Sequence, residues 1–357
     1  MKGKFIEILL LTLVSFFVLP ACNQSNSQSK QMLPPKGTAI LITGAAARIP
    51  QEAALLEHLY KTGQLDSVVF IAGASSGALN TVMLNAILAK KITWEQYIGW
   101  LKKIRNNDIY ISNGKELPVD IQPLRHFLTR IVNDSLGYYK MKDLPITSAI
   151  SITDINMLGM HKKNYRLSNK KINMESDPNL NIVDVLMAST AFPIVFPEER
   201  IPSATTLPDH RFADGGIGDD HVPFSGLLDF IRYREQSVKK VIIVSRKSDS
   251  EPDVSEELKT LGITDKGFFD KLGISLDEIL YKGFIKAMKA MQKKAPDLAK
   301  RTKVYIPNFS DNFLLLDFND LEKQYDVTKK WAQKNNPVPM EMYLSENENS
   351  TLIDQIL

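Results

Sequence analysis

The sequence contains little cysteine, little histidine and little net charge, and each scarcity excludes a class of protein. Cys22 is the only cysteine among 357 residues, so no disulfide bond can form within the chain. Because there is no cysteine–histidine cluster, we expect no structural zinc site, and we predict neither a metal nor a cofactor. The formal net charge of +3 is small for this length and leaves no dense basic patch, which argues against nucleic-acid binding.

The first residues have the pattern of an export signal. Lys2 and Lys4 precede a mostly apolar run over residues 5–19, and Ala21 places a small residue directly before Cys22. The ending Leu-Pro-Ala-Cys resembles the lipobox of bacterial lipoproteins. That resemblance implies cleavage before Cys22, acylation of Cys22, and an exported lipoprotein anchored in a membrane and facing the periplasm or the cell surface. A cleaved, soluble form and an uncleaved membrane anchor are the alternatives.

Composition divides the chain into a leader, a linker, one large domain and a tail. Hydrophobic residues make up 44% and charged residues 24% of the chain, which predicts a packed globular body. We assign residues 1–21 to a lipoprotein signal peptide, 22–36 to a flexible tether rich in Asn, Gln, Ser and Pro, 37–335 to the domain, and 336–357 to a C-terminal tail.

Strand-like and helix-like segments alternate through the first part of the domain. Apolar runs at 38–43 and 67–72 predict buried parallel strands, and residues 51–62 and 77–90 have helix-forming composition. This alternation predicts an α/β fold in which a parallel sheet carries helices on both faces. Further predicted strands are 146–153, 241–245 and 304–306.

Residues 247–303 are predicted to form a helical insertion or cap. Apolar residues recur at near-helical spacing, with lysines between them. They are Phe268, Phe269, Leu272, Leu280, Phe284, Ile285 and Met288. Two interpretations stay open: core packing with a solvated face, or a lipid-facing cap over a site.

The segment Gly73-Ala74-Ser75-Ser76-Gly77 joins a predicted buried strand to a predicted helix. In this context, Gly-x-Ser-x-Gly is typical of a nucleophile elbow, in which the serine sits on a sharp, strained turn and the flanking glycines, Gly73 and Gly77, avoid Cβ clashes. The alternative is a tight glycine turn that only lets the helix pack closely.

A serine needs a base to accept its proton, and the five histidines offer none at the expected place. No histidine follows His221, and His221 lies only seven residues beyond Asp214. The segment Asp214-Gly215-Gly216 instead offers a carboxylate on a glycine-flanked turn. The alternative for Asp214 is a turn-forming role, which is common for aspartate before glycine.

From about residue 36 to residue 331, the chain resembles the patatin-like phospholipases. The matching blocks begin with Thr43-Gly44-Ala45-Ala46-Ala47-Arg48 and continue with the Ser75 elbow, Ala188-Ser189-Thr190-Ala191-Phe192-Pro193, Asp214-Gly215-Gly216 and Leu316-Asp317-Phe318. The resemblance implies a three-layer parallel-sheet patatin-like fold and a Ser–Asp dyad. In this dyad Ser75 is the nucleophile, and Asp214 accepts its proton at a pKa raised by burial. It also implies a lipid or acyl-ester substrate, hydrolysed through an acyl-enzyme.

The resemblance places an oxyanion loop at Gly44, Ala45, Ala46 and Arg48. Both alanines stand where the family usually has glycine, and Ile49 stands where a further glycine is usual. Alanine tolerates positive φ poorly, so the loop either has a different shape or contributes only some of its donors. For Arg48 the alternatives are to hold this loop or meet a lipid phosphate, or to cap a surface loop.

Three functions therefore stay under consideration. The first is an exported, lipid-anchored acyl hydrolase acting on glycerolipids or phospholipids. The second is a catalytically weak or inactive domain of the same fold that binds lipid or a partner, which the alanine-substituted loop motivates. The third is a hydrolase of small esters or thioesters without lipid preference.

Overall fold

The computed structural model describes residues 33–112, 117–155, 163–205, 209–218, 220–248, 254–262 and 276–347. The predicted signal peptide, Cys22 and most of the tether lie outside these residues. No helix among the described residues combines the length and the apolar character that crossing a bilayer requires.

The described strands form one mixed, mostly parallel sheet in the order β4-β3-β2-β1-β6-β7-β8, with β5 also paired to β3. β1 pairs in parallel with β2 and β6, β2 with β3, and β6 with β7. β4 and β5 run antiparallel to β3, and β8 runs antiparallel to β7. The strands are β1 (Thr38–Ile42), β2 (Val68–Ala74), β3 (Thr147–Asp154), β4 (Lys163–Ser168), β5 (Phe212–Asp214), β6 (Lys240–Val244), β7 (Thr302–Tyr305) and β8 (Val338–Pro339).

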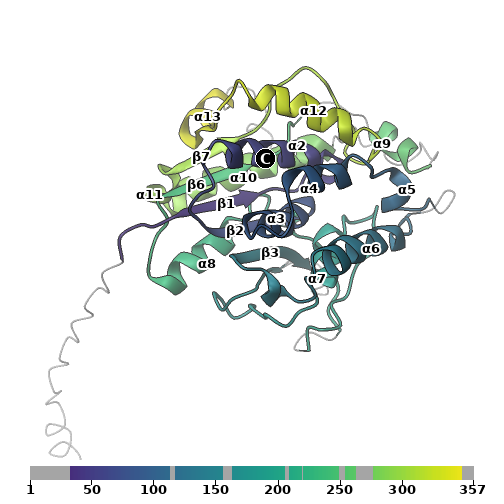
Figure 1. Cartoon of the computed structure of the whole chain (residues 1–357), viewed down its shortest axis with the longest axis horizontal. Coiled ribbons are helices and arrows are strands. Elements are labelled where there is room, and N and C mark those ends of the chain that lie inside the picture. The colour runs from purple at the N-terminus through teal and green to yellow at the C-terminus, as the bar shows by residue number, and fades with distance from the viewer. Residues whose placement is uncertain are drawn as a thin grey trace, which may run out of the picture. The chain divides into compact units, whose positions relative to one another are not determined.

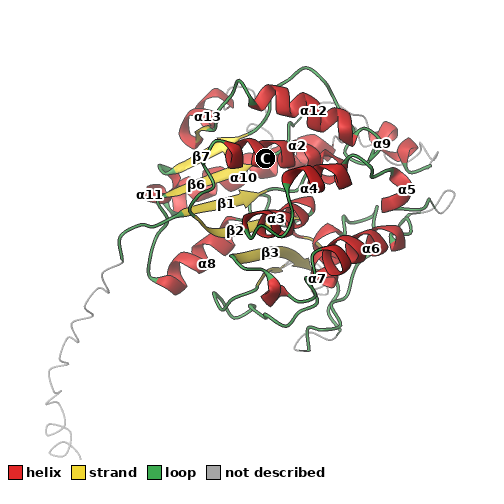
Figure 2. Cartoon of the chain, viewed as in Figure 1, coloured by secondary structure: helices red, strands yellow, loops and turns green. Residues whose placement is uncertain are grey.

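Helices cover both faces of the sheet, as Figures 1 and 2 show. The longer helices are α2 (Ile49–Lys61), α3 (Ser76–Leu88), α4 (Trp94–Leu101), α7 (Ile182–Thr190), α8 (Phe224–Arg234), α10 (Leu276–Lys294), α12 (Leu321–Ala332) and α13 (Met340–Asn347). Shorter helical segments are η1 (Ala46–Arg48), α5 (Asn106–Ile109), α6 (Gln122–Leu128), η2 (Thr129–Ser135), η3 (Met141–Asp143), η4 (Gly215–Ile217), α9 (Val254–Thr260) and α11 (Pro296–Ala299).

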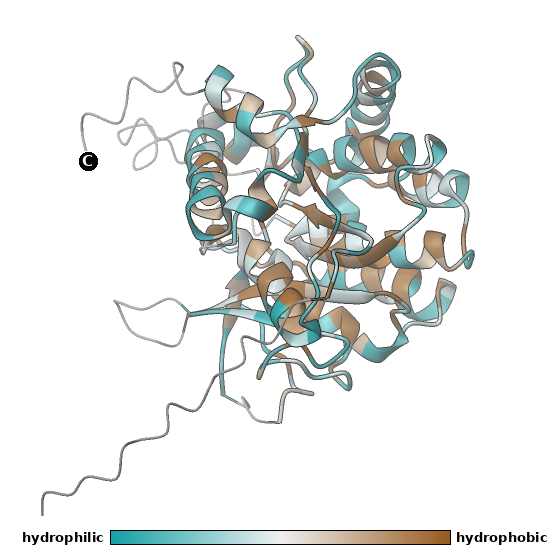
Figure 3. Cartoon of the chain, turned by 90° about the vertical axis from the view of Figure 1, so that its left-hand side faces the viewer, coloured by the Kyte–Doolittle hydropathy of each residue, from teal (hydrophilic) through white to brown (hydrophobic). Residues whose placement is uncertain are grey.

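Successive residues of each strand point to opposite faces, so two hydrophobic cores form. On one face, Ile40 and Ile42 of β1 pack in a cluster with α2, α3, α4, α7 and α12. On the other face, Ala39 and Leu41 pack in a cluster with α8, α10, α11 and α13. In Figure 3 the central strands are brown and the covering helices carry teal on parts of their surfaces, as amphipathic helices do.

The predicted three-layer α/β fold is confirmed, but its sheet is not wholly parallel. Every predicted strand overlaps an observed one, from β1, β2 and β3 to β6 and β7. The antiparallel strands β4, β5 and β8 went unpredicted, because β5 and β8 are very short and β4 (Lys-Asn-Tyr-Arg-Leu-Ser) lacks an apolar run.

The predicted insertion and tail both contribute to the domain. α10 buries Phe284, Ile285 and Met288 in the second core, while Leu280 and Phe284 line the cavity described below, so core packing and covering of a site coexist. Phe268, Phe269 and Leu272 lie outside the described residues. Within 336–357, assigned above to a tail, β8 extends the sheet and α13 packs against it.

Candidate active site

Ser75 occupies a strained turn between β2 and α3, as a nucleophile elbow requires. Its backbone angles are φ 56° and ψ −133°, a region that residues with a Cβ rarely adopt. The N–H of Ser75 donates to the Oγ of Ser189 at 2.9 Å, and that hydroxyl donates to the carbonyl of Ser151 at 2.8 Å. Helix α7 and strand β3 therefore hold the turn in place.

The glycines on either side of the elbow allow backbone segments to approach closely. A Cβ on Gly73 would lie 2.2 Å from the carbonyl oxygen of Gly77, and a Cβ on Gly77 would lie 2.2 Å from that of Thr43. Both obstacles are backbone atoms, which cannot rotate away as side chains do. Any larger residue at either position would therefore push α3 away from β1 and β2.

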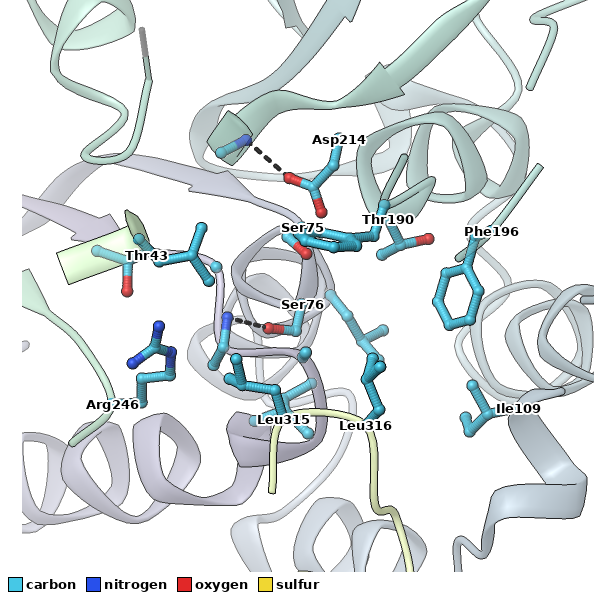
Figure 4. Close-up of a pocket in the computed structure, with 18 of the residues that line it drawn as sticks. Thr43, Ser75, Ser76, Ile109, Thr190, Phe196, Asp214, Arg246, Leu315 and Leu316 are labelled. Atoms are coloured by element: carbon cyan, nitrogen blue, oxygen red, sulfur yellow. Dashed lines mark hydrogen bonds between the residues drawn. The ribbon is translucent and has the colours of Figure 1, made fainter. Parts of the chain in front are cut away.

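Asp214 lies at the end of β5 and is almost fully buried. Its N–H donates to the carbonyl of Ala191 at 2.9 Å, and its own carbonyl accepts from the hydroxyl of Thr153 at 2.9 Å. One carboxylate oxygen accepts the N–H of Gly216 at 2.7 Å, while Figure 4 shows the other directed toward Ser75. A Cβ on Gly215 would lie 2.2 Å from the carbonyl of Ser151, so this turn also depends on glycine.

The surroundings of Asp214 favour a carboxyl group that can exchange a proton near neutral pH. Burial raises the pKa of Asp214 to about 6, and hydrogen bonds from Ser75 and from the N–H of Gly216 oppose that rise. A base whose pKa lies near the working pH combines a useful deprotonated fraction with real affinity for the proton.

The loop after β1 passes directly beside the elbow. Gly44 packs against Ser75, since a Cβ on this glycine would lie 3.0 Å from that of Ser75. The N–H of Ala45 donates to the Oγ of Ser76 at 2.8 Å and is therefore occupied. Ala46 adopts a left-handed φ of 46°. Within the described part of the chain, the backbone N–H groups of Gly44 and Ala46 have no hydrogen-bond partner and remain available as donors.

A cavity lies beside Ser75, where the loops after β1, β2 and β6 meet at the carboxyl ends of these strands. Most of its wall is apolar and includes Ile104, Ile109, Phe127, Phe196, Leu315 and Leu316. One part is polar and is formed by Thr43, Ser245, Arg246 and Ser248. Figure 4 shows Ser75 between Arg246 on one side and Phe196 and Ile109 on the other. The arrangement fits a substrate with a long apolar group and a polar one.

Comparison with known families assigns the chain to one of them. Residues 40–228, more than half of the chain, match the family model described as patatin-like phospholipase. The chain belongs to this family. At the level of the family, the class of activity is lipid hydrolysis.

Comparisons with curated proteins and with solved structures add little to this assignment. A search of curated proteins found no match. VipD from Legionella pneumophila is 13% identical with a TM-score of 0.31, and the match covers 85% of this chain and 68% of that one. The type III effector ExoU is 12% identical with a TM-score of 0.35, over 89% of this chain and 54% of that one. A complex of ExoU with SpcU from Pseudomonas aeruginosa gives 13% identity and a TM-score of 0.30, over 75% and 59%.

Arg48 lies four residues after Gly44, and its side chain points into the protein. Its side chain is fully buried; Nη1 pairs with Asp277 at 2.6 Å and also donates to the carbonyl of Lys247 at 2.9 Å. Its Nε donates to the carbonyl of Phe313 at 2.9 Å. These contacts tie η1 to α10 and to the chain after β7. These contacts fit the interpretation in which Arg48 holds the predicted oxyanion loop. Because the Arg48 side chain is fully buried, it reaches neither solvent nor a lipid phosphate.

Beneath the loop lies a buried polar network that the sequence analysis missed. Glu52 accepts hydrogen bonds from the Thr43 hydroxyl and the Asn80 amide, both at 3.0 Å, and Tyr97 donates to Asn80 at 2.6 Å. Burial raises the pKa of Glu52 to about 8, against the opposing effects of Thr43, Asn80 and Arg246. The network therefore links α2, α3 and α4 to the start of the loop while being largely uncharged at neutral pH.

Two histidines of the described chain, His210 and His221, lie in different surroundings. His210 pairs with Asp154 at 2.6 Å and does not line the cavity. His221 does line it, and its ring fits against Gly283 of α10. His161 lies outside the described residues. Among the residues that the structure describes, no group of histidine, cysteine and acidic side chains is arranged to hold a metal ion.

Proposed function

We propose that this protein is a lipid acyl hydrolase that uses Ser75 and Asp214 as a catalytic dyad. The observation that carries the proposal is the position of Ser75, on a strained elbow facing a buried carboxylate with a pKa of about 6. Membership of a family of lipid hydrolases supports the class of activity. The mostly apolar cavity beside Ser75 supports an acyl chain as the group recognised.

In the proposed mechanism, Asp214 takes the proton of the Ser75 hydroxyl as the oxygen attacks the ester carbonyl. The developing oxyanion receives hydrogen bonds from the free N–H groups of Gly44 and Ala46, and from the N–H of Ser76 at the first turn of α3. Asp214 then gives the proton to the departing alcohol, leaving an acyl-enzyme. Water, activated by Asp214, hydrolyses this ester and releases the fatty acid.

Labelling with a fluorophosphonate, read by intact mass, tests the nucleophile. We expect a single adduct on the folded wild type, no adduct on Ser75→Ala, and loss of ester hydrolysis in both Ser75→Ala and Asp214→Asn. Ser345→Ala removes an exposed hydroxyl on α13 and serves as the matched control, with labelling unchanged. Full hydrolysis by Ser75→Ala would refute the proposal.

The alternative function is lipid binding without turnover. It is favoured by one observation: the N–H of Ala45 is occupied by Ser76, so one potential donor is missing from the loop. Loss of one oxyanion donor typically costs about 2.7–4 kcal/mol of transition-state stabilisation. Binding of a long-chain ester by a folded wild type that shows neither turnover nor labelling would favour this alternative.

The proposal places the enzyme outside the cytoplasm, anchored through acylated Cys22. The leader pattern and the lipobox resemblance support this location. Expression in bacteria with an alkyne-tagged palmitate should label the wild type and leave Cys22→Ser unlabelled. A labelled Cys22→Ser would contradict this anchor.

A further inference from the structure

The N–H group of Ala46, one of the proposed oxyanion donors, belongs to a peptide whose other atoms are held in place. The carbonyl of Ala45, in the same peptide, accepts the N–H of Arg48 at 2.8 Å. Because a trans peptide directs its carbonyl and its N–H to opposite sides, the N–H of Ala46 points away from that of Arg48. The preceding N–H, of Ala45, donates to the hydroxyl of Ser76 at 2.8 Å (Figure 4). The start of this turn is therefore fixed from the side of the elbow.

The end of the turn depends on the chain that follows β7. The N–H of Ala47 donates to the carbonyl of Leu315 at 2.8 Å, which orients the peptide between Ala46 and Ala47. Ala46 has a left-handed φ of 46°, which is unfavourable for alanine. Such a conformation persists only where the surrounding structure enforces it. The position of the Leu315 carbonyl therefore influences the direction of the Ala46 N–H.

Glu257 of α9 holds the segment of Leu315 with both oxygens of its carboxylate. One oxygen accepts the N–H of Leu315 at 2.5 Å, and the other accepts the N–H of Leu316 at 2.8 Å. Glu257 is only 1% exposed, and Arg48 interacts with it electrostatically. Hydrogen bonds to an ionised acceptor are stronger than those between neutral groups. This two-point contact fixes both the position and the orientation of the segment.

Helix α9 is itself attached to the domain close to the same segment. Leu258 and Leu261 are buried in the first hydrophobic core. The hydroxyl of Tyr110 reaches the carbonyls of Thr260 at 2.9 Å and of Leu316 at 3.4 Å. Glu257 does not line the cavity, so it has no direct contact with a substrate bound there.

We infer that Glu257 is a positioning residue for the proposed reaction: through Leu315 and Ala47, it keeps the N–H of Ala46 directed at the oxyanion. This inference rests on the proposed function and gives the helical insertion a part in it. Preorganised donors act on the charge that develops in the transition state, so a misdirected N–H lowers the rate of acyl transfer. Loss of the Glu257 contact should therefore weaken the oxyanion hole while Ser75 and Asp214 stay in place.

The kinetic test compares 4-nitrophenyl octanoate with its thionoester, in which sulfur replaces the carbonyl oxygen. The measured quantity is the ratio of their kcat/KM values, ester over thionoester. Sulfur accepts hydrogen bonds only weakly, so this ratio reports the contribution of the oxyanion donors. A partly unfolded enzyme or a looser cavity wall would slow both substrates alike, and the ratio would not change. The ratio therefore distinguishes positioning of the donor from a merely structural role.

We expect Glu257→Gln to lower this ratio about tenfold, because the amide offers one acceptor and turns its NH2 group toward the second N–H. The fall should be smaller than the roughly 100- to 1,000-fold typical of removing a donor outright, since Ser76 still holds the start of the turn. Glu256→Gln makes the same change at the exposed neighbouring position of α9 and should leave the ratio unchanged. An unchanged ratio in folded Glu257→Gln would overturn the inference.

If Glu257→Gln does not fold, Glu257→Asp carries the test. Aspartate keeps the negative charge beside Arg48, but its carboxylate is one methylene short of the N–H groups of Leu315 and Leu316. The ratio should therefore still fall by several-fold. An aspartate variant that is folded by circular dichroism and has the wild-type ratio would count against a positioning role.

The rate of fluorophosphonate labelling separates failure of this inference from failure of the proposed function. The phosphonyl oxygen uses the same donors as the ester oxyanion, so Glu257→Gln should react about tenfold more slowly than wild type and Glu256→Gln at the wild-type rate. Equal rates for wild type and Glu257→Gln would overturn the inference and leave the nucleophile established. A folded wild type that shows neither labelling nor hydrolysis would overturn the proposed function, and this inference with it.

Discussion

Acidification from about pH 7 to about pH 5 should remove most of the hydrolytic activity, because Asp214 acts in the proposed mechanism only when it is deprotonated. With burial holding its pKa near 6, about nine tenths of the molecules carry the carboxylate at pH 7 and about one tenth at pH 5. The value of kcat/KM should therefore fall about tenfold over this range. A carboxyl group at its ordinary pKa of 3.8 would lose almost nothing, since it would stay ionised throughout.

The assay is initial-rate hydrolysis of a neutral ester across this range, with far-ultraviolet circular dichroism at each pH to show that the enzyme stays folded. His221→Gln is the matched control. Among the described residues that line the cavity, the side chains with a titratable group are those of His221, Asp214 and Arg246. If Asp214 sets the profile, the midpoint stays near pH 6 in His221→Gln. A flat profile in the active wild type, or a midpoint that disappears in His221→Gln, would refute the assignment of the base to Asp214.

Two further predictions concern stability, measured by urea denaturation. In the folded protein Glu52 has a pKa of about 8, compared with an ordinary value of 4.5, so the folded state binds its proton more tightly than the unfolded state does. The contribution of Glu52 to the free energy of unfolding is therefore fully present below about pH 4.5. It is lost by about 1.4 kcal/mol per pH unit up to about pH 8. Glu52→Gln should lack this slope, and parallel curves for the two proteins would contradict the raised pKa. Gly77→Ala should destabilise the fold by about 3 kcal/mol, because the new Cβ meets the carbonyl of Thr43. The control, Gly99→Ala, lies on α4 with open space around it and should stabilise the fold by about 0.5–1 kcal/mol. Equal effects of the two substitutions would show that the contact at Gly77 is easily relieved.

The sequence was informative where a structural element carries its own signal. β1, β2 and β6 are buried on both faces, so each is an uninterrupted apolar run that can be recognised without knowledge of its neighbours. β5 is only Phe212–Asp214, and it exists as a strand because β3 pairs with it. A segment that depends so strongly on its partner has no local pattern to recognise.

The same distinction applies to the candidate site. Ser75 and Asp214 stand in short motifs whose glycines follow from local geometry, and both could be proposed from the sequence. The contacts of Ser189 with Ser75 and of Glu52 with Asn80 could not be predicted, because they join residues 114 and 28 positions apart in the chain. Ser189 lies in a segment that resembles the family, and this was the only available signal for its position.

The two alanines of the proposed oxyanion loop are accommodated with little backbone strain. Ala45 has φ −130°, which any residue adopts, and its methyl group is buried in the core. Only Ala46 takes a left-handed φ, at a cost of about 1–2 kcal/mol. Burial of the Ala45 methyl group contributes about 0.8 kcal/mol in the opposite direction. Alanine in place of glycine therefore costs this loop little stability, and within the described residues the N–H groups of Gly44 and Ala46 have no hydrogen-bond partner.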